Sequence, residues 1–180
     1  GLKRFLNAPG GITMAEAEVR AARKLAALRG ACEADVLYAI GAIGEHLRTM
    51  EGAPSRALRK ELHRLSCHVT ALGGTFDRAA LSKASYSFAR LLDDLGEAWD
   101  SDAVDLHCSA MKLLFAYESV TPEAQARIVA GLEKVRARAV ATAQTEMIAM
   151  IAVATVVLTG TITPAQAFSG FANTSVLLVV

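Results

Sequence analysis

Residues 58–76 read LRKELHRLSCHVTALGGTF, and this stretch decides the fold. Its large apolar residues recur at spacings of four, three, four and three: Leu58, Leu62, Leu65, Val69 and Leu72. On an ideal helix these side chains fall within about 40° of one direction, which predicts an amphipathic helix with one face in a core. Gly73 and Gly74 come next, and because glycine commonly ends a helix we expect this helix to stop there.

Two helices are predicted before this stretch. Thr13 and Glu16 form the capping-box pattern that begins a helix, and Arg29-Gly30 predicts its end. A second helix is expected over residues 31–50. Its inward stripe is Val36, Ile40, Ile43, Leu47 and Met50.

Three more helices are predicted after it. Asp77 is expected to cap the fourth helix and Ser101 the fifth, and Thr121 before Pro122 predicts the start of the sixth. The inward residues of the fourth are Leu81, Ala84, Phe88, Leu91 and Leu95; of the fifth, Val104, Cys108, Met111 and Phe115; of the sixth, Ile128, Leu132 and Val135.

The fold class follows from these segments. No segment alternates with period two for long enough to be a strand, and the loops between the amphipathic helices are short. Short loops favour antiparallel neighbours, so the sequence predicts an all-α antiparallel helical bundle over residues 13–138, after an N-terminal loop at 1–12.

Charge divides the 180-residue chain unevenly. All 19 Lys and Arg residues and 17 of the 18 Asp and Glu residues lie in residues 1–138, which therefore carry a net charge of +2. Residues 139–180 hold only Glu146, a charge content that a soluble segment rarely shows. The near-neutral balance also argues against a nucleic-acid partner. The three cysteines lack paired short spacings and are interpreted as reduced thiols.

The outward side of the 58–72 helix carries a cysteine among basic residues. Opposite the apolar stripe, at about 180°, stands Cys67. Free cysteine usually behaves as a small buried apolar residue, so an outward thiol is unusual. The outer side also carries Arg56, Lys60, His63, Arg64 and Thr70.

The run RLSCHVTALGGTF, residues 64–76, resembles the active helix of histidine-containing phosphotransfer domains. Those domains are helical bundles that exchange a phosphoryl group between an exposed histidine and the aspartate of a response-regulator receiver. Aligning Gly73-Gly74-Thr75-Phe76 on the family's ending places Cys67 at the phospho-accepting position. The resemblance implies that the outer residues, Arg56, Lys60, His63, Arg64, Cys67 and Thr70, contact a receiver-like partner.

This sequence departs from the family at its chemical positions. Cys67 replaces the histidine, Thr70 stands where a lysine is expected, and Ala71 where a glycine is expected. A phosphohistidine needs an imidazole nucleophile and a nearby cation. We therefore expect a bundle that keeps the shape without the phosphotransfer chemistry and is not an enzyme. Transfer to His63 or His68 in a shifted register stays open. His63 shares Cys67's face, whereas His68 is expected toward the edge of the core stripe.

The other cysteines and histidines predict no metal or cofactor site. Cys32 and Cys108 align with inward stripes, while Cys67 points outward, so these thiols cannot close one zinc tetrahedron. His46 and His107 are expected on helix flanks without a functional role.

Residues 139–180 are interpreted as the truncated start of a membrane segment. An uncharged run covers 147–158, and including residues back to Ala139 gives a stretch to Gly160 long enough to insert. The run from Met147 through LTGTITPAQAFSGFAN, ending at Asn173, resembles the early part of anion/sodium symporter permeases, the superfamily of citrate and dicarboxylate transporters. A helical hairpin packed on the bundle is the alternative.

Three functions follow as expectations. The first is a signalling bundle that binds a receiver-like protein and precedes the start of a permease. The second is the N-terminal part of a transporter in which the bundle only supports or regulates. The third is a thiol redox sensor at Cys67. Lys134, Arg136 and Arg138 precede the apolar segment, which predicts a cytoplasmic-membrane location with the bundle in the cytoplasm.

Overall fold

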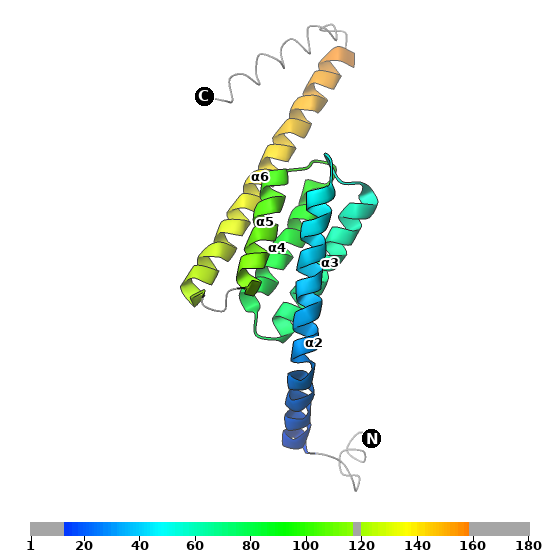
Figure 1. Ribbon diagram of the computed structural model, residues 1–180. Helices are drawn as coiled ribbons and strands as arrows, with labels where there is room; N and C mark the ends of the chain where they lie inside the picture. Colours follow the sequence, from blue (N-terminus) through cyan, green and yellow to red (C-terminus); the bar gives the residue numbers. More distant parts are fainter. Residues whose placement is uncertain (1–12, 117–119, 159–180) are drawn as a thin grey trace, which may run out of the picture.

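The computed structural model describes residues 13–116 and 120–158. The described residues form five helices, α2 (Met14–Thr49), α3 (Arg56–Thr75), α4 (Ala79–Leu95), α5 (Ser101–Ala116) and α6 (Pro122–Leu158). Successive helices run in opposite directions and pack as a bundle (Figure 1). The prediction of an all-α bundle is confirmed, and no strand occurs in the described ranges.

The first two predicted helices are one continuous helix, α2. Thr13 caps it as expected: its hydroxyl accepts from the Glu16 amide at 3.2 Å, and the Glu16 carboxylate accepts from the Thr13 amide at 2.8 Å. The predicted break at Gly30 is wrong. Glycine ends a helix when it adopts a left-handed backbone, and Gly30 has no positive φ. Helix-favouring alanines and long side chains surround it and carry the helix through.

The core lies where the apolar stripes of the helices meet. From α3 the predicted residues Leu62, Leu65 and Val69 are buried, while Leu58 and Leu72 are partly buried against the core. The largest fully buried side chains from the other helices include Ile43, Leu81, Phe88, Leu91, Leu92, Val104 and Met111. Burying each such side chain contributes about 1.5–3 kcal/mol. The core therefore determines which side of each helix points inward.

The α3–α4 interface is closer than the apolar stripes predict, because small residues line it. Ser66 is fully buried, and Gly73 faces Ser82, whose amide nitrogen would lie 3.2 Å from a Cβ added at Gly73. The Ser82 hydroxyl donates to the Thr70 carbonyl at 2.8 Å. The predicted stop at Gly73-Gly74 is therefore wrong by two residues. Gly73 lets α4 approach, and the helix continues through Gly74 to Thr75.

Two predicted caps differ in the structure. Asp77 has φ 62° and lies before Arg78, the N-cap of α4, which makes no side-chain cap hydrogen bond. The Asp100 carboxylate, rather than Ser101, accepts from the Ala103 amide at 2.9 Å at the start of α5. Because Ser101 already belongs to the helix, the residue before it does the capping. The Thr121 cap is confirmed by a 3.3 Å hydrogen bond from the Ala124 amide.

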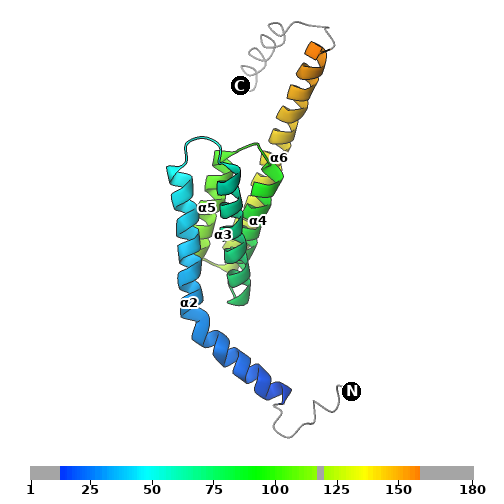
Figure 2. The same ribbon diagram turned by 90° about the vertical axis from the view of Figure 1, so that its right-hand side faces the viewer.

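Helix α6 crosses the point where the composition changes. It begins at Pro122 as predicted and continues to Leu158, so the compositional boundary at 138/139 falls inside one helix. Ala139 is buried against the bundle, and the helix then extends beyond the other helices (Figures 1 and 2). Within the described ranges, no helix is both long and apolar enough to cross a bilayer. The N-terminal loop and the permease-like stretch after Leu158 lie outside the described residues.

Candidate functional site

The outer face of α3 presents Cys67 to solvent. Cys67 is exposed, as are Arg56, Lys60 and Arg64, while His63 is half-buried. The exposure of Cys67 follows from the burial of Leu62, Leu65 and Val69 on the opposite side of the same helix. The structure thus brings five of the six predicted partner-binding residues to one accessible surface, which we call the α3 face: Arg56, Lys60, His63, Arg64 and Cys67.

Cys67 lies against His63 one turn earlier. Its Sγ is 3.7 Å from His63 Nδ1 and 3.9 Å from Nε2. The Nε2 atom of His63 is 3.2 Å from Oδ2 of Asp93, near the end of α4. The imidazole therefore lies between a thiol and a carboxylate. A carboxylate that accepts from Nε2 orients the imidazole and leaves Nδ1 facing the thiol, so the ring can exchange a proton with the thiol.

Arg64 is held by a neighbour on its own helix. Its guanidinium donates two hydrogen bonds to the Glu61 carboxylate, at 2.8 and 2.6 Å. This hydrogen bonding lowers the pKa of the Glu61 carboxyl, so the pair stays ionised around neutral pH. Both groups are accessible to solvent, so the pair orders the Arg64 side chain more than it stabilises the fold. Arg64 therefore presents an ordered cation beside Cys67.

Thr70 and His68 do not lie where the apolar stripe alone places them. Thr70 is half-buried toward α4, and its hydroxyl donates to the Ser66 carbonyl at 3.0 Å. His68 is exposed and not at the edge of the core. Both differences have one cause: Ser66 and Gly73 are buried, so the buried arc of α3 is rotated toward α4, which draws Thr70 inward and turns His68 outward.

A shallow basic hollow adjoins the α3 face. It has a volume of about 300 Å³ and is lined by Arg56, Arg59, Lys60, His63, Leu92, Asp93, Gly96 and Glu97. Arg59 closes it, because its guanidinium donates to the Gly96 carbonyl and lies 3.7 Å from the Glu97 carboxylate. Sequence reasoning missed Arg59 and Asp93. Only the pairing of α3 with the end of α4 brings them to His63, and no local pattern indicates it.

His107 is a core residue, so its predicted flank position is wrong. It is fully buried; its Nδ1 lies 2.7 Å from the Ala103 carbonyl oxygen, and its Nε2 lies 3.2 Å from the Ser87 hydroxyl. Because a carbonyl only accepts, Nδ1 carries a proton, and in the neutral ring Nε2 accepts from the Ser87 hydroxyl. Burial lowers the pKa of His107, consistent with that state. The hydrogen bonds satisfy both nitrogens within the core.

The remaining cysteines lie apart from the α3 face. Cys108 is buried as predicted, and burial raises the pKa of its thiol. Cys32 is half-buried rather than in the core. In the described ranges, no group of three or more Cys, His, Asp and Glu residues is placed to hold a metal ion.

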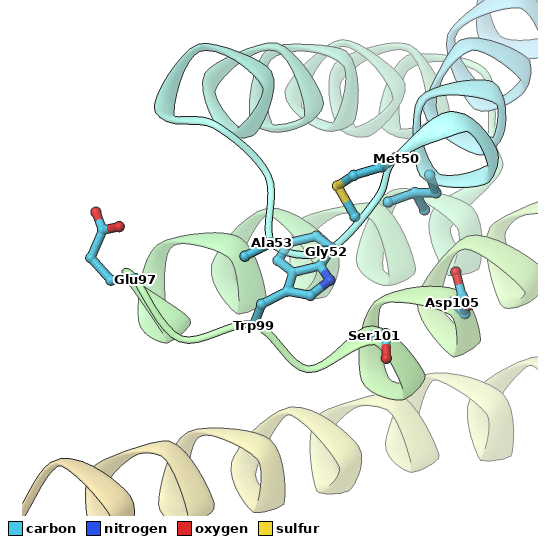
Figure 3. Close-up of a pocket in the computed structure, with 8 residues that line it drawn as sticks. Met50, Gly52, Ala53, Glu97, Trp99, Ser101 and Asp105 are labelled. Carbon is cyan, nitrogen blue, oxygen red and sulfur yellow. The ribbon is translucent and has the colours of Figure 1, made fainter. Parts of the chain in front are cut away.

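A second hollow lies where the α2–α3 and α4–α5 loops meet. It has a volume of about 540 Å³, and its lining includes Met50, Gly52, Trp99 and Asp105. In Figure 3, Trp99 stands between Glu97 on one side and Asp105 on the other, so their carboxylates do not face a common point. This hollow lacks paired titratable groups, and the α3 face is therefore the better candidate for chemistry or recognition.

Comparison of the chain with protein-family models, curated proteins and solved structures finds no match. The candidate site is therefore defined by its geometry alone. The exposed Cys67 thiol contacts the His63 imidazole, and the imidazole contacts the Asp93 carboxylate. Lys60 and Arg64 are exposed on the same helix.

Proposed function

We propose that the bundle is a signalling module that binds a receiver-like protein through the α3 face and passes no phosphoryl group through position 67. The observation that carries the proposal is the position of Cys67, exposed at the middle of α3 with Lys60 and Arg64 on the same surface. A thiol in that place supplies no imidazole nucleophile, while the exposed cations suit an acidic partner surface.

The electrostatics of the α3 face support an acidic partner. Arg56 and Lys60 are exposed on α3, and Arg59 lies half-buried beside them. The sequence resemblance points to receiver domains, which carry the phosphoryl group on an aspartate, and such an anionic group suits these cations. Charges of opposite sign at such rims raise association rates and fix orientation, more than they raise affinity. We expect transient binding that weakens as salt increases.

The test measures binding and phosphotransfer separately. The full chain is titrated against a panel of purified receiver domains by calorimetry, and the same receivers, phosphorylated, are incubated with it. We expect binding to at least one receiver, a loss of roughly tenfold or more in Lys60→Glu/Arg64→Glu, and no acid-labile phosphate on the chain. Lys83→Glu/Arg90→Glu, with the same charge change on α4, is the control and keeps the affinity.

Two results would overturn the proposal. Binding that is equal in the α3 and α4 variants would place the partner elsewhere. Acid-labile phosphate that disappears in His63→Gln or His68→Gln would restore a phosphotransfer function in a shifted register.

A second candidate, thiol redox sensing, is favoured by the contact between Cys67 and His63. In this reaction the Cys67 sulfur attacks one oxygen of hydrogen peroxide, an S–O bond forms and the O–O bond breaks. The Cys67 thiol first passes its proton to His63, the sulfur is oxidised to a sulfenic acid, and the departing hydroxide takes that proton back from His63 and leaves as water. Trapping the sulfenic acid with a dimedone probe tests it. His63→Gln is expected to slow trapping, and an unchanged rate would exclude the role of His63.

A transporter function in which the bundle only supports a permease is a third reading, and the apolar character of the end of α6 supports it. Met147, Ile148, Met150 and Ile151 are all more than half exposed there. Membrane attachment through this end, with the bundle in the cytoplasm, is compatible with partner binding at the α3 face, which lies on another helix.

A further inference from the structure

The first half of α2 projects beyond the bundle as a bare helix. Residues 14–32 are here called the α2 arm. Its N-terminal part extends past the ends of the other helices in both views (Figures 1 and 2), while Arg29 contacts Phe76 and Cys32 is half-buried. Met14 is 79% exposed, Leu25 45% and Leu28 53%. An isolated helix of this length is marginal in water, and apolar side chains on it gain stability only when a partner covers them.

Six apolar residues of the arm form one seam, while Val19, 58% exposed, lies on the opposite side of the helix. They recur at spacings of three, four, four, three and four: Met14, Ala17, Ala21, Leu25, Leu28 and Cys32. At 100° per residue these six fall within an arc of about 80°, the narrow seam typical of two-helix pairing. Along the seam, Ala17 and Ala21 lie in the N-terminal half, and Leu25 and Leu28 lie in the C-terminal half.

We propose that the α2 arm pairs antiparallel with the α2 arm of a second copy of this chain. In an antiparallel two-fold pair centred at residue 23, residue numbers that face each other sum to about 46. Ala21 then faces the second copy's Leu25, Ala17 faces its Leu28, and Met14 faces its Cys32. Each large side chain meets a small one, which is what close packing of two helices requires.

The charges beside the seam are self-complementary in the same register. Glu18 and Arg29 lie on one flank of the seam, about 20° apart in helical projection. Their numbers sum to 47, so each Glu18 faces the Arg29 of the other copy, twice per dimer. Arg29 also lies over the Phe76 ring and 3.9 Å from the Asp77 carboxylate of its own chain, and it stays half exposed for this second contact. The other flank carries Arg20 and Lys24, which gain nothing from the pairing. Two kinds of contact therefore favour the same register: the Glu18–Arg29 ion pairs and the packing of each alanine against a leucine of the second copy.

A second copy fits the arm better than an unrelated partner does. In the antiparallel pair, the arm of a second copy places a small residue opposite a large one at each of the three kinds of layer. A helix of unrelated sequence does not carry this size pattern in both halves of the seam. Because the seam contains only one Met and two Leu per copy as large residues, we expect a weak dimer with a dissociation constant in the micromolar range.

Sedimentation equilibrium of the full chain over a range of concentrations tests the proposal. We expect a monomer–dimer equilibrium. Glu18→Arg or Arg29→Glu alone creates like-charge pairs and weakens the dimer by roughly tenfold, while the double swap restores it. Leu25→Glu/Leu28→Glu abolishes the dimer while circular dichroism retains the helical bundle signal. The control is Arg23→Glu, which makes the same charge change on the opposite side of the arm and leaves the equilibrium unchanged.

Three results would overturn the proposal. They are a native chain that stays monomeric at the highest concentration, equal effects of Arg29→Glu and Arg23→Glu, and a double swap that fails to restore association. Association through the exposed end of α6 would leave all arm variants at the native value and would also refute pairing of the arms.

Discussion

The hydroxyl of Ser66 donates to the carbonyl oxygen of Ser85 at 2.6 Å, and the hydroxyl of Ser85 donates to the carbonyl oxygen of Ser66 at 2.7 Å. Both residues are fully buried, one on α3 and one on α4. Each hydroxyl thus satisfies itself on the backbone of the other helix. This reciprocal pair fixes the contact of α3 with α4 and, together with the buried Leu62, Leu65 and Val69, leaves Cys67 on the exposed side of α3.

We predict that Ser66→Ala lowers the free energy of unfolding by about 1 kcal/mol, because it removes one buried hydrogen bond. Ser66→Leu is expected to cost about 1–3 kcal/mol more, since α4 leaves no space for the larger side chain. Urea denaturation measures both. Ser109→Ala, at an exposed position on α5, is the control and should change little. A Ser66→Leu variant as stable as the native chain would contradict the close α3–α4 contact.

Gly73 and Gly74 provide a matched comparison. Alanine favours a helix over glycine by about 1 kcal/mol, so both Gly→Ala changes would stabilise α3 if space allowed. A Cβ at Gly73 would lie 3.2 Å from the Ser82 amide nitrogen and 3.4 Å from the Arg78 carbonyl oxygen, whereas a Cβ at Gly74 meets only the Ser82 hydroxyl, at 3.5 Å. We predict that Gly73→Ala destabilises the bundle and that Gly74→Ala does not. Equal thermal midpoints would show that α4 gives way easily.

His107 makes the bundle sensitive to mild acid. Its pKa is lowered in the folded protein, chiefly by burial, so the unfolded chain binds the proton more readily. The stability contributed by the neutral ring is therefore complete above its ordinary pKa of 6.5 and is lost as pH falls below that value. One proton gives a slope of at most about 1.4 kcal/mol per pH unit.

The measurement is urea denaturation at several values between pH 7.5 and 5. We predict that His107→Gln loses stability at pH 7.5 and shows a flatter pH profile than the native chain over this range. His68→Gln, at an exposed position on α3, keeps the native profile. Parallel profiles for the native chain and His107→Gln would assign the acid sensitivity to other groups.

The three thiols are predicted to react in the order Cys67, Cys32, Cys108. Cys67 is exposed and Cys32 is half-buried, while Cys108 is buried with a raised pKa. A thiolate is the reactive form, and access to it limits alkylation of a folded protein. Alkylation followed over time with peptide mapping gives the order, and unfolded chain provides the reference in which all three react. Early labelling of Cys108 would mean that the register of α5 is wrong.

The end of α6 is predicted to bind lipid bilayers. Met147, Ile148, Met150 and Ile151 are exposed there, and anchoring scales with apolar area that enters the interface. Co-sedimentation of the full chain with anionic vesicles measures binding. Met147→Glu/Ile151→Glu is expected to reduce the bound fraction several-fold, while Leu37→Glu, at an equally exposed site on α2, does not. Equal losses in both variants would exclude α6 as the contact.

The sequence alone determined which segments are helical and most of the large side chains that enter the core, although it missed Leu92. Leu62, Leu65 and Val69 are buried and Cys67 is exposed, as the spacing on α3 predicts, because a 3.6-residue period sorts large apolar groups from charged ones without knowledge of the neighbours. The capping residues Thr13 and Thr121 are also local signals, since each bonds an amide three residues away.

The tertiary structure decided what small and polar residues do. Gly30 lies within α2 and Gly73 faces α4, although both read as helix stops, because a glycine ends a helix only where the chain adopts a left-handed backbone. His107 became a core residue because Ser87 and the Ala103 carbonyl supply its partners. Asp93 reaches His63 only because α4 packs beside α3. Hydrophobic periodicity carries no information about such partners, since they come from distant parts of the chain.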